Sequence, residues 1–380
     1  MKGVLFTHRG FEDVAAREVK EITGASTETT EGTVSFDAKS LAEICSLTYR
    51  SQSAAKVMLL LFEFQAWFDY ERTCESLKKG LSDTDMSQWL EKDLTFKATC
   101  GRLGEHRYTS QDIMLETGRL IKDRTGRDID LESPDTIFHV QIINSRGYFG
   151  VDFSGIDLSK RDYRIFTHPA ALKGTAAYCL LRTADYKRTE TLLDPFSRSG
   201  IIPIEAALFA SKTPVNLHRK ESLAFMHLKP LTEEEVQQVF AADANRDFKG
   251  RIHCIDSSMP SITSAQKNAK LAGVNKLISF SRIEVEWLDT KFSKGEVDRI
   301  ITSPPEASKK IGQNFADKLY KEFFYQCDYV LAEKGTVTLL ARNPEPLIRH
   351  ASQYKFTPAA ERTVFLGKEE WKVLRLGRSS

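Results

Sequence analysis

The stretch TLLDPFSRSGIIPIEAALFA, residues 191–210, decides the fold. It opens with strand-forming residues that end at Asp194, continues through the small residues Ser199 and Gly200, and closes with an apolar helical segment that has Pro203 near its start. Proline is tolerated there because the first N–H groups of a helix have no partner within the helix. A strand, a tight loop and a helix in this order predict one βα unit, although a single unit of this kind is also an ordinary turn.

The βα alternation continues toward the C-terminus. Strands are predicted at residues 251–256, 277–282, 297–302 and 335–341, and helices at 203–210, 261–274 and 314–331. Apolar strands that alternate with helices are typical of a parallel sheet covered on both faces. The last two strands, 362–367 and 371–377, are separated by a few residues and predict an antiparallel hairpin at the sheet edge. Residues 211–242 break the alternation.

The N-terminal part has a different pattern. Short strands and amphipathic helices follow each other from residue 4 to 68 and again from 94 to 154, which predicts an α+β architecture. Residues 110–126 have helical spacing, with Ser110 as the predicted N-cap and Gly126 as the C-terminal stop. Residues 156–173 form a polar, basic connector between the two parts.

Length, charge and cysteine usage narrow the class of protein. The 380 residues are enough for two or three domains, and a net charge of +2 excludes a strongly cationic nucleic-acid coat while permitting a local basic face. The sequence has no apolar run of about 18 residues and no signal peptide, so we expect a cytoplasmic protein with no membrane partner. None of the six cysteines stands in a CxxC pair, which favours reduced cysteines packed as small hydrophobes over zinc or disulfides.

Polar residues follow several predicted strands, and in a parallel α/β sheet ligands bind beyond these strand ends. Asp256 ends one strand, where an acid can accept both hydroxyls of a ribose, although it is equally a cap for the next helix. Glu284 follows another strand and is placed to accept from an adenine amino group, or to stand as a solvated surface residue. The loop after Asp194 precedes a helix N-terminus, which suits a carboxylate or phosphate.

The strand at residues 297–302 leads into Ser303, Pro304, Pro305 and Glu306. Proline fixes φ and removes the backbone N–H donor. This corner therefore presents carbonyl oxygens and the Ser303 hydroxyl without competing donors. Such acceptors hold an exocyclic –NH2 group and direct its nitrogen lone pair toward a methyl donor; a rigid strand-to-helix turn is the alternative.

The C-terminal half resembles the class I S-adenosylmethionine-dependent methyltransferases, and the whole chain is similar to RNA methyltransferases that carry a THUMP domain. The similarity is greatest to the archaeal-type tRNA guanine-N2-methyltransferases, with bacterial ribosomal RNA guanine-N2 enzymes next. It rests on collinear stretches along the chain: GFEDVAAREVKE, CGRLGEHRYTSQDIMLETG, IDLESPDTIFHVQI, FGVDFSGIDLSKRDYRIFTHPAALKGTAA and NAKLAGV.

The resemblance implies a fold and a domain order. We expect an α/β fold: a Rossmann-like methyltransferase domain with a mainly parallel seven-stranded sheet and an antiparallel edge hairpin, preceded by an α+β ferredoxin-like subdomain and a THUMP RNA-binding domain. The expected ranges are 1–68 for the ferredoxin-like subdomain, 69–155 for THUMP, 156–175 for a basic linker and 176–380 for the methyltransferase domain.

The resemblance also implies roles for the strand-end residues. S-adenosyl-L-methionine is the expected cofactor, and no metal is expected. The expected cofactor-binding residues are Asp194, Pro195, Phe196, Ser199 and Gly200 at the methionine end, Asp256 and Ser257 at the ribose, and Glu284 at the adenine. Ser303, Pro304, Pro305 and Glu306 match the family's Asn-Pro-Pro-Tyr catalytic loop.

The sequence departs from the family pattern in both loops. In the cofactor loop Ser197 and Arg198 stand where the family has Cys and Gly, so Arg198 points outward, pairs with the cofactor carboxylate or blocks the site. In the catalytic loop Ser303 replaces Asn, and Glu306 replaces an aromatic residue that stacks on the flipped base, a contact of about 1–3 kcal/mol. One hypothesis is that the Glu306 carboxylate instead accepts from N1–H and N2–H of guanine.

The predicted RNA contacts are basic residues of the THUMP part and of the connector. They are Lys97, Arg102, His106, Arg107, Lys160 and Arg161, with Arg119, Lys122, Arg124, Arg127 and Arg164 as further candidates. Acidic residues are interleaved with them, so a solvated face is the alternative. Phosphate contacts carry little sequence specificity, so RNA shape and extrusion of the base must select the nucleotide.

We expect the protein to methylate an exocyclic base amine in RNA, guanine N2 in tRNA in the first place, with ribosomal RNA as the other substrate considered. No cysteine stands in a nucleophile position, which argues against a carbon-5 pyrimidine mechanism. Two alternatives stay open: an inactive RNA-binding homologue with a degenerate cofactor loop, and an adenine-N6 methyltransferase, which shares the loop type. Partner proteins are not predicted.

Overall fold

The computed structural model describes residues 1–241, 248–307 and 311–378, and the chain separates into two compact units. The first unit contains residues 1–7, 15–158 and 219–241, and the second contains residues 8–14, 159–218 and the described residues from 248 onward. Most of the segment that breaks the βα alternation therefore belongs to the first unit. The finer division into four domain ranges stays a prediction.

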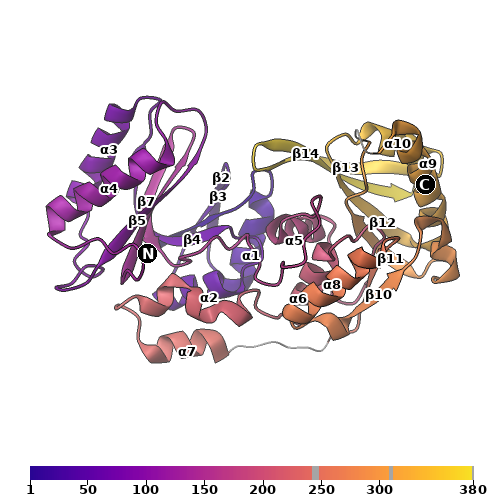
Figure 1. The fold of residues 1–380 in the computed structure, drawn as a ribbon, viewed down its shortest axis with the longest axis horizontal. Coiled ribbons are helices and arrows are strands. Elements are labelled where there is room, and N and C mark those ends of the chain that lie inside the picture. The colour runs from indigo at the N-terminus through magenta and orange to yellow at the C-terminus, as the bar shows by residue number, and fades with distance from the viewer. Residues whose placement is uncertain (242–247, 308–310, 379–380) are drawn as a thin grey trace. The chain divides into compact units, whose positions relative to one another are not determined.

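The first unit is built on one seven-stranded sheet with the order β2-β3-β1-β4-β7-β6-β5 (Figure 1). Its strands are β1 (Lys2–Phe6), β2 (Thr27–Thr30), β3 (Thr33–Asp37), β4 (Lys56–Gln65), β5 (Phe96–Leu103), β6 (Thr136–Ile143) and β7 (Arg146–Asp152). Neighbouring strands are antiparallel except β5 and β6, which are parallel. The sheet thus runs without a break through the residues predicted for the ferredoxin-like subdomain and for THUMP.

Three helices of the first unit follow the predicted amphipathic segments, whereas the helices at residues 70–83 and 233–241 were not predicted. The helices are α1 (Glu12–Thr23), α2 (Leu41–Arg50), α3 (Tyr70–Asp83), α4 (Ser110–Thr125) and α7 (Glu233–Ala241), with 3-10 turns at Leu217–Ser222 and Ala224–His227. The predicted N-cap of α4 is wrong by one residue: Thr109 caps the helix, because its hydroxyl accepts from Asp112 N while Asp112 accepts from Thr109 N. Gly126 ends α4 in the left-handed region, φ 68°, as predicted.

The second unit has a seven-stranded sheet with the order β10-β9-β8-β11-β12-β14-β13. Its strands are β8 (Thr191–Asp194), β9 (Arg251–Asp256), β10 (Ile278–Arg282), β11 (Val297–Thr302), β12 (Leu331–Ala341), β13 (Phe356–Leu366) and β14 (Glu369–Arg378). The first five strands in this order are parallel, and β14 and β13 are antiparallel. The predicted mainly parallel seven-stranded sheet with an edge hairpin is confirmed, and the strand order reverses at β8, where such sheets bind ligands.

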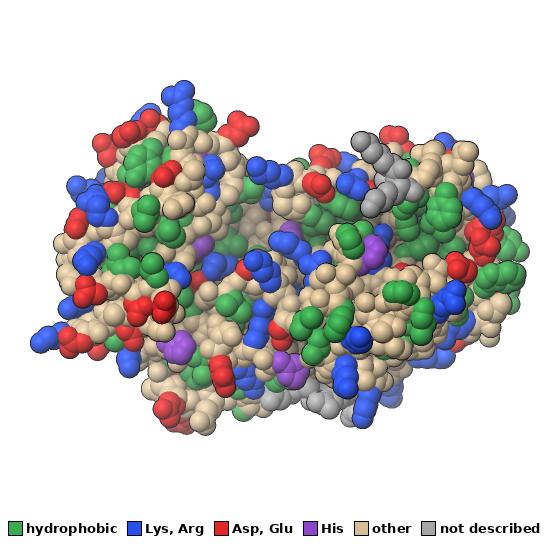
Figure 2. Space-filling model, viewed as in Figure 1, with side chains coloured by type: hydrophobic (Ala, Val, Ile, Leu, Met, Phe, Trp, Pro, Cys, Tyr) green, Lys and Arg blue, Asp and Glu red, His purple; other side chains and the backbone are tan. Residues whose placement is uncertain are grey.

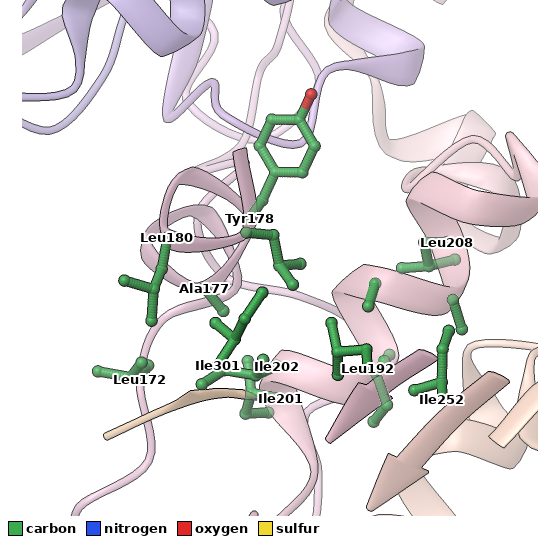
Figure 3. Close-up of a cluster of buried hydrophobic side chains, with 14 of the residues drawn as sticks. Leu172, Ala177, Tyr178, Leu180, Leu192, Ile201, Ile202, Leu208, Ile252 and Ile301 are labelled. Carbon is green, nitrogen blue, oxygen red and sulfur yellow. The ribbon is translucent and has the colours of Figure 1, made fainter. Parts of the chain in front are cut away.

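Helices cover both faces of this sheet (Figure 1). They are α5 (Gly174–Thr183), α6 (Ile201–Ser211) and α8 (Met259–Leu271) on one face, α9 (Gln313–Val330) and α10 (Glu345–Ser352) on the other, with 3-10 turns at Asn275–Leu277 and Val285–Thr290. Successive strand residues point to opposite faces. Leu192 and Ile301 therefore pack with α5 and α6, as Figure 3 shows, while Leu193 and Ile300 pack with α9. Burial on both faces explains why these strands are continuously apolar.

Most of the cysteines lie in the protein interior. All six are free thiols; Cys45, Cys179, Cys254 and Cys327 are buried, and Cys74 and Cys100 are half-buried. Among the described residues, no group of three or more His, Cys, Asp or Glu side chains is arranged to hold a metal ion. No described helix combines the length and the apolar character that a membrane crossing requires.

Candidate active site

A cleft of about 1010 Å³ opens at the carboxyl edge of the second unit's sheet. This is at the upper end of the roughly 300–1,000 Å³ found for small-molecule sites. Its wall combines the loops after β8, β9 and β11 with residues 167–173 and the turn of the β13–β14 hairpin. The wall contains ten of the twelve residues predicted for cofactor binding and catalysis: Pro195, Phe196, Ser199, Asp256, Ser257, Glu284, Ser303, Pro304, Pro305 and Glu306.

The other two, Asp194 and Gly200, are not among the described residues that line this cleft. Asp194 is 1% exposed, and its Oδ1 accepts from Thr302 Oγ1 at 2.6 Å and from Phe196 N at 3.2 Å. Burial raises the pKa of Asp194 to about 7, although these two hydrogen bonds act in the opposite direction. Asp194 therefore joins the end of β8 to the end of β11 and supports the cleft wall from behind, and its predicted contact with the cofactor stays a prediction.

Backbone geometry and helix packing both require a glycine at position 200. It is the N-cap of α6 with φ 79°, and a Cβ placed on it would lie 2.7 Å from Ala265 Cβ on α8. A glycine allows both the left-handed backbone and the close approach of the two helices.

Arg198 lies on the cleft wall with its backbone in the left-handed region, φ 49°. Its N–H donates to Asp256 Oδ2 at 2.8 Å, whereas its guanidinium forms no hydrogen bond or ion pair with any described residue. Burial lowers the pKa of Arg198, and the carboxylates of Asp194, Asp256 and Glu306 act to raise it. The outward orientation considered from the sequence is not the one observed, and the cleft remains open around this side chain.

Asp256 does not cap the helix that follows it. Its Oδ1 accepts from Ser258 N at 2.9 Å, but Ser258 is the N-cap of α8. Nearby, Ser199 Oγ is buried and has no hydrogen-bond partner among the described residues. Ser257 and Glu284 are exposed on the same wall. This part of the cleft therefore offers an unused hydroxyl, a carboxylate with lone pairs to spare and an exposed acid.

The Ser303–Pro305 corner presents fewer free acceptors than the sequence suggests. Tyr320 donates its hydroxyl to Pro305 O at 2.7 Å, and burial raises the pKa of Tyr320 to about 12, which keeps the hydroxyl protonated. Ser303 Oγ donates its proton to Leu340 O at 2.9 Å, so the hydroxyl faces any ligand as an acceptor. Pro304 O accepts from no described residue. The corner thus offers two acceptors, Ser303 Oγ and Pro304 O.

Glu306 has a role that its sequence position does not reveal. Its Oε1 accepts from Arg342 N at 2.6 Å and from Asn343 N at 3.2 Å, and its Oε2 accepts from Arg342 Nε at 3.0 Å. The guanidinium of Arg342 lies 5.1 Å from the centroid of the Trp371 ring. Arg342 and Trp371 both line the cleft, and the sequence analysis missed them because the chain separates Glu306 from Arg342 by 36 residues.

In the first unit, three of the predicted RNA contacts, Arg102, His106 and Arg107, lie at the end of β5 and directly after it. Arg102 donates to His106 Nδ1 at 3.0 Å, and His106 Nε2 donates to Asn144 O at 2.8 Å. Arg107 is exposed, with its guanidinium 5.2 Å from the ring centroid of Phe68. Phe68 is 55% exposed, and such aromatic–arginine pairs, which the sequence analysis missed, suit stacking on unpaired bases.

Several other side chains predicted to contact RNA already form ion pairs or hydrogen bonds within the protein. Arg161 is wrong as a contact: its guanidinium and the Glu205 carboxylate are both 0% exposed and pair at 2.7 Å, so the charge never reaches the surface. Arg119 pairs with Glu116 and Asp123, and Lys122 pairs with Asp128. Three candidates donate to backbone oxygens, namely Lys97 to Leu131, Arg127 to Leu90 and Arg164 to Ala171. Lys160 and Arg124 are exposed, and Figure 2 shows cationic and anionic side chains intermixed on the face in view.

The comparisons with known proteins agree with this geometry. Residues 161–371 match the RMKL-like methyltransferase domain, and residues 71–152 match the THUMP domain. A relative from Methanocaldococcus jannaschii named tRNA (guanine(6)-N2)-methyltransferase is 27% identical over 96% of this chain and 94% of its own length. A protein of the same name from Archaeoglobus fulgidus is 31% identical over 83% of this chain and 76% of its own length.

Solved structures show the same fold over the whole length. A putative methyltransferase complexed with SAH has a TM-score of 0.83 at 19% identity and covers 100% of this chain and 98% of its own. TrmN from Thermus thermophilus has a TM-score of 0.73 at 22% identity and covers 100% of this chain and 99% of its own. The predicted fold and enzyme class are confirmed: the chain belongs to the RMKL-like methyltransferase family, with a THUMP domain ahead of its methyltransferase domain.

Proposed function

We propose that the protein methylates N2 of guanine at position 6 of tRNA, using S-adenosyl-L-methionine. The observation that carries this proposal is that one cleft wall holds Asp256, Ser257 and Glu284 together with the corner formed by Ser303 and Pro304. The names of the two relatives supply the nucleotide and its position. A cytoplasmic location belongs to the same proposal, because the substrate is a tRNA.

The residues at the cofactor end of the cleft fit this cofactor. When bound, S-adenosyl-L-methionine supplies an electrophilic methyl group on a sulfonium. The guanidinium of Arg198 would pair with the methionyl carboxylate, since it lies on the wall without an ion-pair partner among the described residues. Asp256 retains lone pairs that would accept from the ribose hydroxyls, and the exposed Glu284 would accept from the adenine amino group.

The Ser303 and Pro304 acceptors hold the two N–H bonds of the guanine amine. Because Ser303 gives its own proton to Leu340 O, its oxygen can only accept, as the amide oxygen of the family's asparagine would. With both protons held in this way, the lone pair on N2 would point out of the acceptor plane and would be available for a methyl group supplied by the cofactor. Neither acceptor is basic, so the proton that N2 loses passes to water in the open cleft.

The first unit delivers the RNA. The THUMP match covers β5, α4 and the residues Arg102, His106 and Arg107. Cations and aromatic rings together give salt-dependent affinity with little sequence specificity. The target base must leave its stack before the amine can reach the corner, which makes base extrusion part of the reaction.

Methylation assays on tRNA transcripts that differ at one nucleotide test this proposal. Guanosine at position 6 should gain one methyl group, identified as N2-methylguanosine by nucleoside mass spectrometry. Inosine at position 6 keeps the ring but lacks the N2 amine and should gain none. Methylation of adenosine at the same position would instead support the adenine-N6 activity. No transfer to any transcript, with no SAH binding in calorimetry at millimolar ligand, would identify an inactive RNA-binding homologue.

A further inference from the structure

A planar cation stands on the cleft wall beside the amine-binding corner. Arg342 follows β12, whose Leu340 O accepts from Ser303 Oγ, so the cation lies two residues beyond the strand residue that contacts the corner. β14 pairs with the end of β12 through Ala341 and Lys372, which brings Trp371 to the same edge of the sheet. Ser303, Arg342 and Trp371 all line the cleft.

The guanidinium of Arg342 is held in place from two sides. Glu306 accepts from its Nε and from the backbone N–H of Arg342, and the Trp371 ring lies 5.1 Å away from the guanidinium carbon. The Arg342 side chain is nevertheless 54% exposed, and its two terminal amino groups donate to no described residue. A fixed guanidinium with free donors loses little rotamer freedom when it binds a ligand.

We propose that Arg342 reads the target base as guanine by donating hydrogen bonds to its O6 and N7 atoms. This inference rests on the proposed guanine-N2 activity. When the N2 amine is held at Ser303 and Pro304, guanine presents its two acceptors, O6 and N7, on another part of its edge, and two parallel donors of an arginine match that pair. Adenine presents an amino group where guanine has O6, and two donors then face each other.

The same geometry assigns Glu306 a positioning role. In place of reading the base itself, its carboxylate orients Arg342, since both of its oxygens already accept from residues 342 and 343. The chain thereby has a glutamate–arginine pair at the place where the family's loop has an aromatic residue.

Base analogues at position 6 of the tRNA test whether Arg342 recognises the base itself or only contributes to RNA binding in general. 2-Aminopurine keeps the N2 amine and lacks O6. For the wild-type protein, guanine should be methylated about 10- to 100-fold faster than 2-aminopurine in single-turnover assays, as expected for charged hydrogen bonds. Arg342→Ala should slow guanine methylation by at least this factor and 2-aminopurine methylation by a clearly smaller one, because 2-aminopurine retains only N7 of the two acceptors.

Two further variants test the positioning role and the specificity of the effect. Glu306→Gln should reduce the ratio of the guanine rate to the 2-aminopurine rate. The double variant Glu306→Gln/Arg342→Ala should have the same ratio as Arg342→Ala alone. Arg349→Ala is the matched control, because Arg349 is another exposed arginine paired with a carboxylate, that of Asp317, and does not line the cleft. It should leave the ratio unchanged, and SAH affinity should stay constant in all variants.

Three results would overturn the inference. Equal slowing of both bases by Arg342→Ala would show a phosphate or general positioning contact, and no slowing of either base would show that Arg342 has no role. A wild-type protein that methylates 2-aminopurine as fast as guanine would show that O6 is not read. Failure of the wild type to methylate guanine at all would be a different result, because it overturns the proposed function and this inference with it.

Discussion

At the scale of single residues, Arg198 is the most informative departure from the family pattern. Its backbone has φ 49°, a region that costs a non-glycine residue about 1–2 kcal/mol. Such strain persists where the surroundings impose it, and it is concentrated at ligand sites. The Arg198 side chain lies on the wall of the cleft and forms no ion pair with a described residue, which agrees with the proposed pairing of this cation with the cofactor carboxylate.

Replacing Arg198 by glycine tests this role. Arg198→Gly should weaken SAH binding about 10- to 100-fold, because a hydrogen-bonded charge pair of about 1.5–3 kcal/mol is lost. 5′-Methylthioadenosine, which lacks the amino-acid group, should bind the variant and the wild type equally well. Calorimetry with both ligands measures the two effects. Tighter SAH binding by the variant would show that Arg198 obstructs the cleft.

The sequence predicts those parts of the site whose contacts follow from the order of strands along the chain, and it does not predict contacts between side chains of distant loops. The residues after β8, β9 and β11 were predictable because parallel strands bring their carboxyl ends to one edge. The contacts of Glu306 were not predictable, since they join two loops 36 residues apart and depend on side-chain direction. The same holds for Pro305 O, whose partner Tyr320 lies on the following helix.

At the scale of elements, a buried ion pair connects α6 to the segment that precedes α5. Arg161 Nε donates to Glu205 Oε1 at 2.7 Å, Arg161 Nη2 donates to Glu205 Oε2 at 3.1 Å, and Tyr163 also donates to this carboxylate. Sequence patterns predict exposure for an arginine in a basic connector, and only the packed structure shows that this one is enclosed. A charge that is fully enclosed costs free energy unless its partner is present.

We predict that Arg161→Met destabilises the protein by about 3–5 kcal/mol, because the buried Glu205 carboxylate would lose this ion pair. Adding Glu205→Gln should restore part of this loss, since the glutamine is neutral and still accepts from Tyr163. Lys160→Ala, at an exposed neighbouring position, should change stability by about 0.5 kcal/mol or less. Thermal and denaturant unfolding measure all three variants. A stable Arg161→Met protein that binds tRNA poorly would show that Arg161 contacts RNA.

At the scale of the whole molecule, the proposed function divides the work between the two units, with RNA binding in the first and cofactor binding in the second. The alternation of apolar strands and helices identified the second unit from sequence, because burial on both faces leaves a strong signal. The sequence signal of the first unit is weaker. The alternation of strands and helices is interrupted between residues 68 and 94, which suggests two subdomains, whereas the seven strands form one sheet. Pairing of β4 with β7, far apart in the chain, makes the sheet continuous, and local periodicity does not report such pairing.

This division predicts that RNA and cofactor affinities can be changed separately. Arg107→Ala, in the first unit, should weaken tRNA binding several-fold and reduce the slope of log affinity against log salt by about 1, as expected when one phosphate contact is removed. SAH affinity should not change, because every residue of the described cleft wall belongs to the second unit. Arg17→Ala, at an exposed position on α1, is the control and should keep the wild-type salt slope. Binding titrations at several salt concentrations, with calorimetry for SAH, provide both measurements. A wild-type slope for Arg107→Ala would remove this arginine from the RNA contact, and a parallel loss of SAH affinity would show that the two activities are not separable.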